Sequence, residues 1–409
     1  FFQAEDGIRD PLWSRGLGDV YKRQCLNNAF PWYSWIFILS LLPANGRTSL
    51  NCAERFPCDF LSERVQLQMP KHGPKTMQVV VLAGGFGTRL RPWTYGIPKP
   101  ILPMLDKTLL EHVVEVIPSD KVDEVVVAGG YKVDMIEQYF NENEVPFDVR
   151  IVKETEPLGT GGALGNCRDV ISGQFACLNG DIISSLNMQK GIDLHDKNGG
   201  IGTLALWEVE DPTRFGIVGI DDDNRITQFK EKPKHEEVFS NLINAGSYLF
   251  EEDIFSYIPT GKCSLEREVF PVLAEENELN GYAFEGYFID AGTPESWSSG
   301  VQACIANQRW KSGSRKGTNW HADSSVQIGE TCTVEHTMLA KNSKINDSIL
   351  SRCSLLDGVQ VKEKSILSNT MIGRGSTIGK NCRLNNVVVD HNSIIPDGTV
   401  LDGAQWPIK

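Results

Sequence analysis

The stretch LAGGFGTRLRPWTYGIPKP, residues 82–100, follows a short apolar run at Gln78–Ala83. A continuous apolar run of this length is typical of a strand buried on both faces of a sheet. Three glycines come directly after it, and glycines let backbone N–H groups approach an anion closely. Arg89 and Lys99 then supply the charge-assisted hydrogen bonds that a polyphosphate needs. The stretch therefore predicts a phosphate site at the end of a buried strand.

Two common phosphate-binding loops do not fit this stretch. The P-loop requires GxxxxGK followed by Ser or Thr, but Gly261-Lys262 precedes Cys and Gly379-Lys380 precedes Asn. The dinucleotide fingerprint GxGxxG requires a third glycine where Leu90 stands. A glycine loop after a strand is, taken alone, more often a turn than a site, so the prediction depends on the basic residues beside it.

Apolar runs and helical patterns alternate along the chain up to about residue 306. The runs predict buried strands at Gln78–Ala83, Glu124–Ala128, Asp148–Val152, Phe175–Leu178 and Thr203–Val209. Apolar residues spaced near 3.6 predict helices at Thr108–Ile117, Lys132–Phe140 and Ser185–Asp196. Alternation of this kind indicates an α/β fold in which helices cover a mostly parallel sheet. Ligands of such sheets bind beyond the carboxyl ends of the strands.

The C-terminal tail follows a six-residue period instead. The unit is clearest in IGRGSTIGKNCRL, where Ile372, Ile378 and Leu384 are six positions apart. This period is the signature of a parallel β-helix, in which three short strands form one coil, whereas a plain β-sandwich does not predict it. Residues 326–403 would hold roughly four coils of about 18 residues.

Composition and charge narrow the function classes. The chain has 409 residues, of which 41% are hydrophobic and 23% charged, as in an ordinary globular protein of two or three domains. A net charge of −13 argues against nucleic acid or an anionic membrane as a partner. The apolar run Trp32–Leu42 is too short to span a membrane. Ten cysteines without a CxxC pair favour a reduced, cytoplasmic protein.

The first 76 residues do not fit the pattern of the rest. The sequence begins with Phe, and residues 1–24 resemble a translated sequencing adapter. We expect residues 1–76 to be an artefact or an unstructured leader, and Met77 to open the first strand. The expected domains are then residues 77–310, which form the α/β domain, and residues 318–409, which form the β-helix.

Seven further motifs follow in order and carry a family resemblance. They are PKP (98–100), EPLGTGGAL (156–164), LNGD (178–181), RFGIV (214–218), FKEKP (229–233), NAGSYLF (244–250) and FIDAGTP (288–294). Together with GGFGTRLRP, they resemble the sugar-nucleotidyltransferases, the nucleotide-sugar pyrophosphorylases, over residues 77–306. The resemblance implies a Rossmann-like nucleotidyltransferase domain followed by a short left-handed parallel β-helix of hexapeptide repeats.

The resemblance also implies a reaction, in which a sugar 1-phosphate and a nucleoside triphosphate give a nucleotide-sugar and pyrophosphate. The LRP–PKP form, the domain order and EDPTRFGIV most resemble the branch that uses GTP and mannose 1-phosphate. Branches that use UTP, dTTP or ATP with glucose 1-phosphate share the core motifs and stay open. A catalytically inactive regulatory subunit of the same fold is a further alternative, although the charged motif residues are retained. Mg²⁺ is the expected cofactor, and a homo-oligomer formed through the β-helix is the expected assembly.

The resemblance assigns roles to the motif residues. The catalytic cations are Arg89, Lys99 and Lys232. The nucleotide-binding residues are Leu82, Ala83, Gly84, Gly85, Gly87, Thr88, Gly161 and Asn179. The residues for the sugar phosphate are Gly216, Glu231, Lys232, Asn244 and Gly246, and the metal ligands are Asp181 and Asp290. The plain alternatives are turn geometry for the glycines, a turn or helix cap for the aspartates and a solvated surface for Lys232.

His391 invites a different interpretation. Some β-helices with six-residue repeats are acyltransferases that use a catalytic histidine, and His391 lies in VVVDHNSII. Four coils are few for that activity, so a packing or assembly role for the tail is favoured.

Overall fold

The computed structural model describes residues 76–311, 315–316, and 319–407. The expected leader therefore lies outside the described residues, apart from Thr76, and so does part of the expected boundary between the two domains. Within the described residues, no helix is both long and apolar enough to cross a membrane. The cysteines among these residues are free thiols, namely Cys167, Cys177, Cys263, Cys304, Cys332, Cys353 and Cys382.

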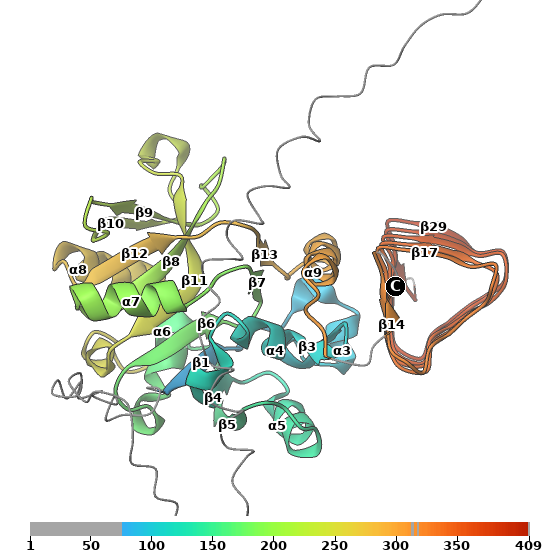
Figure 1. Cartoon of the computed structure of the whole chain (residues 1–409), viewed down its shortest axis with the longest axis horizontal. Helices are drawn as coiled ribbons and strands as arrows, with labels where there is room; N and C mark the ends of the chain where they lie inside the picture. Colours follow the sequence, from blue (N-terminus) through green and yellow to red (C-terminus); the bar gives the residue numbers. More distant parts are fainter. Residues whose placement is uncertain (1–75, 312–314, 317–318, 408–409) are drawn as a thin grey trace, which may run out of the picture. The chain divides into compact units, whose positions relative to one another are not determined.

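A nine-stranded sheet forms the centre of the first domain (Figure 1). Its strands are β1 (Met77–Leu82), β4 (Val122–Gly129), β5 (Asp148–Lys153), β6 (Phe175–Asn179), β8 (Gly202–Glu208), β9 (Gly216–Ile220), β10 (Ile226–Glu231), β11 (Leu242–Phe250) and β12 (Leu279–Ala283). The order is β10-β9-β11-β6-β1-β4-β5, and β8 joins β11 to β12. β6, β1, β4 and β5 run parallel, while β11 is antiparallel to β6. The expected α/β sheet, with β1 at its centre, is confirmed.

Helices cover both faces of this sheet. They are α3 (Trp93–Gly96), α4 (Leu109–Val114), α5 (Val133–Glu142), α6 (Gly159–Gly165), α7 (Gln189–Asn198), α8 (Phe270–Glu275) and α9 (Pro294–Ala306). Successive side chains of a strand point to opposite faces. Val79 and Val81 therefore join the core that includes α4, whereas Val80 joins the core that includes α6. Burial on both faces explains the unbroken apolar run of β1.

Two short antiparallel pairs of strands complete this domain. They are β2 (Pro103–Met104) with β3 (Lys107–Thr108), and β7 (Ile182–Ser184) with β13 (Phe288–Asp290). The second pair matters for function because it brings residue 290 beside residue 182, at the end of β6.

The predicted helices are displaced at their ends for local reasons. Thr108 is the N-cap of α4, because its side chain accepts a hydrogen bond from the Glu111 N–H in a capping box. The predicted helix Ser185–Asp196 was placed too early, since α7 begins at Gln189. Ser185 is held instead in an extended segment, where its N–H donates to the Tyr287 carbonyl oxygen at 3.0 Å.

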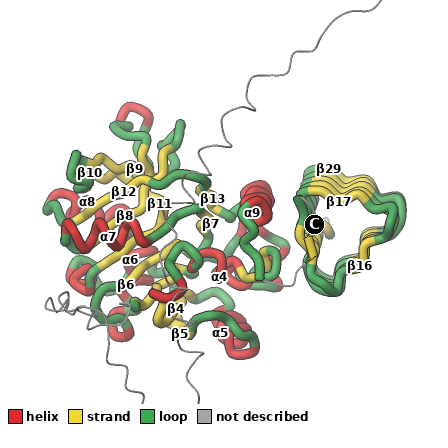
Figure 2. The backbone as a smooth tube through the Cα atoms, viewed as in Figure 1, coloured by secondary structure: helices red, strands yellow, loops and turns green. Residues whose placement is uncertain are grey.

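The second domain is a stack of triangular coils with strands along their sides (Figures 1 and 2). One side is β15 (His321–Ala322), β18 (Met338–Leu339), β21 (Ser354–Leu355), β24 (Met371–Ile372), β27 (Val388–Val389) and β30 (Gln405–Trp406), with β14 (Arg315–Lys316) antiparallel to β15. A second side is β16 (Gln327–Ile328), β19 (Lys344–Ile345), β22 (Gln360–Val361), β25 (Thr377–Ile378) and β28 (Ile394–Ile395). The third side is β17 (Thr333–Glu335), β20 (Ile349–Ser351), β23 (Ile366–Ser368), β26 (Arg383–Asn385) and β29 (Val400–Asp402). From β15 onward the strands of each side pair in parallel, as expected of a left-handed parallel β-helix.

The coils are shorter than expected. Val361, Leu367, Ile372 and Ile378 all point into the interior, but the step from Leu367 to Ile372 is five residues rather than six. The tight corner at this step contains Asn369, whose φ is +47°. Paired strands are consequently 16 or 17 residues apart, so the estimate of 18 residues per coil was wrong and the described residues hold one more coil than expected.

Candidate active site

The predicted nucleotide residues gather at one edge of the sheet. Leu82 at the end of β1 pairs in register with Ala128 of β4 and Asn179 of β6. The carboxyl ends of these parallel strands therefore meet, and the loops that follow them share one edge. β11 runs in the opposite direction beside β6, which brings Asn244 and Gly246 to the same edge.

The glycine loop after β1 needs its glycines for close packing. Gly87 has a φ of +60°, and a Cβ there would lie 2.8 Å from Thr94 Cγ2. The Thr94 hydroxyl donates a hydrogen bond to the Gly87 carbonyl oxygen at 2.8 Å. A Cβ at Gly84 would lie 2.9 Å from Glu154 Oε1, whereas Gly85 and Thr88 are exposed. The loop thus has a fixed backbone and open space over its exposed residues.

Two ion pairs join the predicted cations to the predicted metal ligands. Lys99 Nζ lies 2.7 Å from Asp181 Oδ2, and the Lys99 side chain is only 11% exposed. Arg89 Nη2 lies 3.6 Å from Asp290 Oδ2, in a pair that is about half exposed. The Lys99–Asp181 pair is therefore the shorter and more buried of the two, and the outer pair, Arg89–Asp290, leaves the Arg89 guanidinium open to an arriving ligand.

The two aspartates are held next to each other by the backbone. Asp290 of β13 stands opposite Ile182 of β7, and the Ala291 N–H donates to the Asp181 carbonyl oxygen at 2.9 Å. Gly292 follows, where a Cβ would collide with the Arg89 guanidinium and lie 2.7 Å from Asp290 Oδ1. These contacts place Asp181, Asp290 and Arg89 in one cluster and explain the glycine in FIDAGTP.

The carboxylates fit a magnesium ion only in combination with a substrate. Asp290 Oδ1 is buried and has no hydrogen-bond partner among the described residues. Those same residues offer no group of three His, Cys, Asp or Glu side chains close enough to hold a metal ion. Two carboxylates plus phosphate oxygens suit Mg²⁺, which takes few protein ligands and keeps several waters.

The residues predicted for the sugar phosphate form a second group. Gly216 of β9 stands opposite Glu231 of β10, and a Cβ at Gly216 would lie 2.9 Å from Glu231 Oε2. Lys232 Nζ lies 3.5 Å from Glu231 Oε1 and is 58% exposed. Burial raises the pKa of Glu231, as does the charge of Glu266, while Lys232 opposes the shift.

Asn244 and Gly246 shape the end of β11. The Asn244 amide donates to the Tyr248 hydroxyl at 2.8 Å, and its Oδ1 accepts from the Gly246 N–H at 3.0 Å. Gly246 has a φ of +67°, and a Cβ there would collide with the Asn179 side-chain amide. These contacts join Asn179 to the predicted sugar residues, while direct contact of Asn244 with a sugar stays a prediction.

Gly161 serves packing in the structure. It is buried in α6, and its N–H donates to the Cys263 carbonyl oxygen at 3.0 Å. A Cβ there would lie 2.8 Å from Cys263 Sγ. These contacts account for the glycine by themselves, and its role beside the base stays a prediction.

Sequence reasoning missed Glu154. This residue follows β5, and it lines a pocket of about 240 Å³ with Gly84, Phe86, Gly130 and Tyr131. Burial raises the pKa of Glu154, and its Oε1 is buried without a hydrogen-bond partner among the described residues. The rule that ligands bind after the strands of a parallel sheet could have singled it out, because it comes directly after β5.

Comparisons with known proteins agree with the motifs. Residues 78–306 match the family described as Nucleotidyl transferase, and residues 317–406 match the family described as GMPPB C-terminal domain. The chain is 33% identical over 331 residues to the Arabidopsis thaliana protein named "Probable mannose-1-phosphate guanylyltransferase 2". The aligned region covers 76% of this chain and 90% of that protein. It is 32% identical over 344 residues to "Mannose-1-phosphate guanyltransferase beta-B" of Xenopus laevis, and this alignment covers 80% of this chain and 95% of that protein.

Among solved structures, HddC from Yersinia pseudotuberculosis aligns with 30% identity and a TM-score of 0.46. The alignment covers 55% of this chain and 98% of that one.

Proposed function

The chain belongs to the nucleotidyl transferase family, and we propose on this premise that it transfers the guanylyl group of GTP to mannose 1-phosphate. An oxygen of the sugar phosphate bonds to the α-phosphorus of GTP. The bond from that phosphorus to the α,β-bridging oxygen breaks, and pyrophosphate leaves with the electron pair. The observation that carries the proposal is the cluster of Arg89, Lys99, Asp181 and Asp290, in a chain whose relatives are named for this reaction.

The attacking group needs no general base from the protein. The second pKa of a phosphate monoester is near 6, so its oxygen is already ionised at neutral pH. The protein has to bring two anions together, align them and neutralise the charge that develops on pyrophosphate.

The two cations at the edge of the sheet differ in what they can do. Arg89 is half exposed and stands at the open side of the cluster, so it is suited to the β- and γ-phosphates. Lys99 is largely buried and fixed by Asp181, so it is suited to a phosphate held close to the carboxylates. Lys232 is exposed on a separate strand end, where it can bind the sugar phosphate while Glu231 accepts hydrogen bonds from sugar hydroxyls.

Asp181 and Asp290 would hold Mg²⁺ together with the triphosphate. The ion, when bound, would neutralise phosphate charge that the two cations leave uncompensated. The unpartnered Asp290 Oδ1 supports this assignment, because a buried carboxylate oxygen without a partner is costly to maintain.

Glu154 supports guanine as the base. Its side chain lines a pocket with Gly84, which belongs to the predicted nucleotide loop. Its Oε2 accepts a hydrogen bond from the Leu158 N–H at 3.3 Å, and its buried Oε1 has no partner among the described residues. Guanine presents two adjacent N–H donors, at N1 and N2, and an ionised carboxylate can accept both. Uracil and thymine present one such donor between two carbonyl groups, and a carboxylate would repel those carbonyls.

One assay tests the proposal and its alternatives together. Pyrophosphate release is measured for GTP, UTP, dTTP, ATP and CTP, each with mannose, glucose and N-acetylglucosamine 1-phosphates. We expect GTP with mannose 1-phosphate to give the highest kcat/KM. A preference for UTP, dTTP or ATP with glucose 1-phosphate would replace the substrates and keep the reaction. Turnover with none of the pairs would favour the inactive regulatory subunit. A cytoplasmic location and a homo-oligomer formed through the β-helix stay predictions.

A further inference from the structure

His391 of the β-helix binds the backbone of α3 in the catalytic domain. Its Nε2 lies 3.0 Å from the Trp93 carbonyl oxygen, and its Nδ1 lies 3.0 Å from the Arg374 backbone nitrogen. A carbonyl oxygen can only accept and a backbone N–H can only donate. The imidazole is therefore neutral, with its proton on Nε2. This leaves no free ring nitrogen to act as the catalytic base of an acyltransferase.

Several close contacts surround this histidine, which is partly buried. The Trp93 ring is fully buried and stacks near the His391 ring, with centroids 6.5 Å apart and planes at 24°. The Trp93 indole N–H donates to the Val389 carbonyl oxygen at 3.0 Å. A Cβ at Gly96 would lie 2.6 Å from His391 Cδ2, so only glycine fits at the end of α3. The Gln405 amide adds a hydrogen bond to the Arg91 carbonyl oxygen at 3.0 Å.

The segment held in this way joins the two catalytic cations. α3 (Trp93–Gly96) lies between Arg89 and Lys99, and it is separated from Arg89 by three residues and from Lys99 by two. Thr94 of α3 also donates to the Gly87 carbonyl oxygen, at the turn that leads into Arg89. A displacement of α3 would therefore move both cations and the glycine loop at once.

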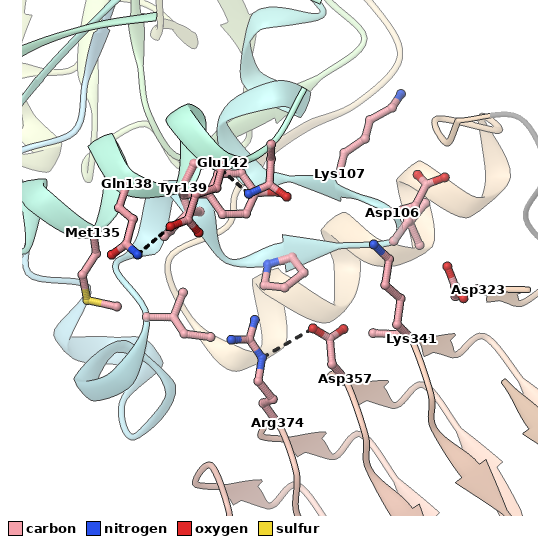
Figure 3. A pocket seen from close by; sticks show the side chains of 16 residues that line it. Asp106, Lys107, Met135, Gln138, Tyr139, Glu142, Asp323, Lys341, Asp357 and Arg374 are labelled. Carbon is pink, nitrogen blue, oxygen red and sulfur yellow. Dashed lines mark hydrogen bonds and ion pairs between the residues drawn. The ribbon is translucent and has the colours of Figure 1, made fainter. Parts of the chain in front are cut away.

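In each earlier coil, one residue stands at the corner of the β-helix that corresponds to His391. These residues contact the catalytic domain less closely than His391 does. Lys341, Asp357 and Arg374 occupy this corner on successive coils before His391. They line a cavity of about 550 Å³ that separates them from Tyr139 of α5. Figure 3 shows Arg374 turned toward Asp357, with which it forms an ion pair of 3.4 Å. The corner closes onto the catalytic domain at the His391 coil, beside α3.

We propose that His391 is a positioning residue of the nucleotidyl transfer reaction. Through α3, it keeps Arg89 and Lys99 in the arrangement that grips the triphosphate. The proposal rests on the function proposed above. It gives the β-helix a part in nucleotide binding that is separate from assembly.

Two substitutions separate the bond to Trp93 from the bond to Arg374. In His391→Gln, the side-chain amide N–H can replace Nε2 and donate to the Trp93 carbonyl oxygen. In His391→Asn, the shorter side chain can replace Nδ1 as acceptor for Arg374 but does not reach Trp93. Both variants lose the ring, and they differ from each other by one methylene group. We expect His391→Asn to raise the KM for GTP about 10-fold and to lower kcat, and His391→Gln to stay within about threefold of wild type. The KM for mannose 1-phosphate should be unchanged in both.

Ser365→Ala is the control for damage to the β-helix alone. Its hydroxyl donates to the Gly379 carbonyl oxygen at 2.8 Å and accepts from the Cys382 N–H at 3.1 Å, so both contacts stay within the coils. This variant should lower the melting temperature and leave the KM for GTP unchanged. An equal rise of that KM in Ser365→Ala and His391→Asn, or in the Gln and Asn variants alike, would overturn the positioning role.

A second measurement does not depend on the reaction. Amide hydrogen exchange of residues 84–99 should be faster in His391→Asn than in wild type, and His391→Gln should restore most of the protection. Unchanged exchange in His391→Asn would contradict the proposal even if the enzyme is active. If wild type does not turn over GTP, the proposed function fails, while the exchange data still decide whether His391 holds this segment.

Discussion

Lys99 Nζ lies 2.7 Å from Asp181 Oδ2, so a cation predicted to grip the triphosphate is paired with a carboxylate predicted to hold magnesium. The pair stands at the end of β6, where the Lys99 side chain is 11% exposed and the Asp181 side chain is 34% exposed. The contact is both an ion pair and a hydrogen bond, in which Lys99 donates to the Asp181 carboxylate. Removal of either charge therefore affects both the metal site and the phosphate site.

Asp181→Asn should reduce turnover about 100-fold or more, while the protein stays folded. The amide has the same shape but lacks the negative charge that both Lys99 and Mg²⁺ require. Pyrophosphate release at saturating substrates and Mg²⁺ measures the loss, and the melting temperature serves as the control for folding. Near-normal turnover with Mg²⁺ would rule out the role of Asp181.

Gly292→Ala should raise the KM for GTP. The added methyl group would collide with the Arg89 guanidinium and press on Asp290 Oδ1, which displaces the outer ion pair. We expect an increase of about 10-fold, measured by initial rates at varied GTP. Gly329→Ala is a matched control, because a Cβ there meets ordinary contacts of 3.4–3.6 Å. Equal kinetics for the two variants would show that Arg89 does not need this space.

Lys232→Ala should act on the sugar phosphate instead. The KM for mannose 1-phosphate should rise about 10- to 100-fold, which corresponds to about 1.4–2.8 kcal/mol of binding free energy. The neighbouring Lys230→Ala is the control, because Lys230 pairs with Glu237 at 2.8 Å and should not contact substrate. If the KM for GTP rose in place of that for the sugar phosphate, the assignment of Lys232 would be wrong.

Glu154→Gln should weaken the choice of base. Inosine triphosphate has the N1–H of GTP but lacks the N2 amino group, so it probes the second hydrogen bond alone. Wild type should prefer GTP to inosine triphosphate by about 10-fold or more. The variant should reduce that ratio, because its amide presents one acceptor oxygen and one NH2 donor in place of two acceptor oxygens. An unchanged ratio of kcat/KM would place the base elsewhere.

Acid should destabilise the protein partly through Glu115. Burial raises the pKa of this carboxyl, but His112, Lys107 and Arg309 outweigh burial and lower the pKa to about 2. The Arg309 guanidinium lies 2.7 Å from Glu115 Oε2. A lowered pKa stabilises the fold above the ordinary value near 4.5, and the stabilisation fades as the pH falls toward 2. The difference in free energy of unfolding between wild type and Glu115→Gln should therefore shrink from pH 5 to pH 3. A constant difference over this range would contradict the shift.

The sequence predicted the parts of the site that depend on local pattern. The apolar run at Gln78–Ala83 and the glycines after it predict a buried strand and the tight loop that follows it, because burial on both faces and close backbone approach leave direct traces in composition. Phosphate binding by this loop stays a prediction. The pairing of Lys99 with Asp181 left no such trace, since it spans 82 residues and depends on the order of the strands. The resemblance supplied both residues but not their contact.

The contact of His391 with Trp93 was beyond sequence reasoning for the same reason, because the two residues are 298 positions apart in the chain. The coil length was overestimated because the period of six holds at two corners of most coils, whereas the third corner has a step of five residues. At that corner, a residue with positive φ, such as Asn369, makes a tight turn, so that successive interior residues are five positions apart instead of six. Asparagine tolerates this conformation well, so its recurrence at 369 and 386 was the available signal.

The coil on which His391 lies limits where coils can be inserted into the β-helix. One additional coil before His391 would move it along the axis by about 4.8 Å, the spacing of neighbouring strands, and no hydrogen bond to Trp93 could survive that shift. Coils added after Gln405 would leave the contact untouched. The His391 contact therefore fixes the number of coils that precede it, whereas coils can be added after it without loss of this contact.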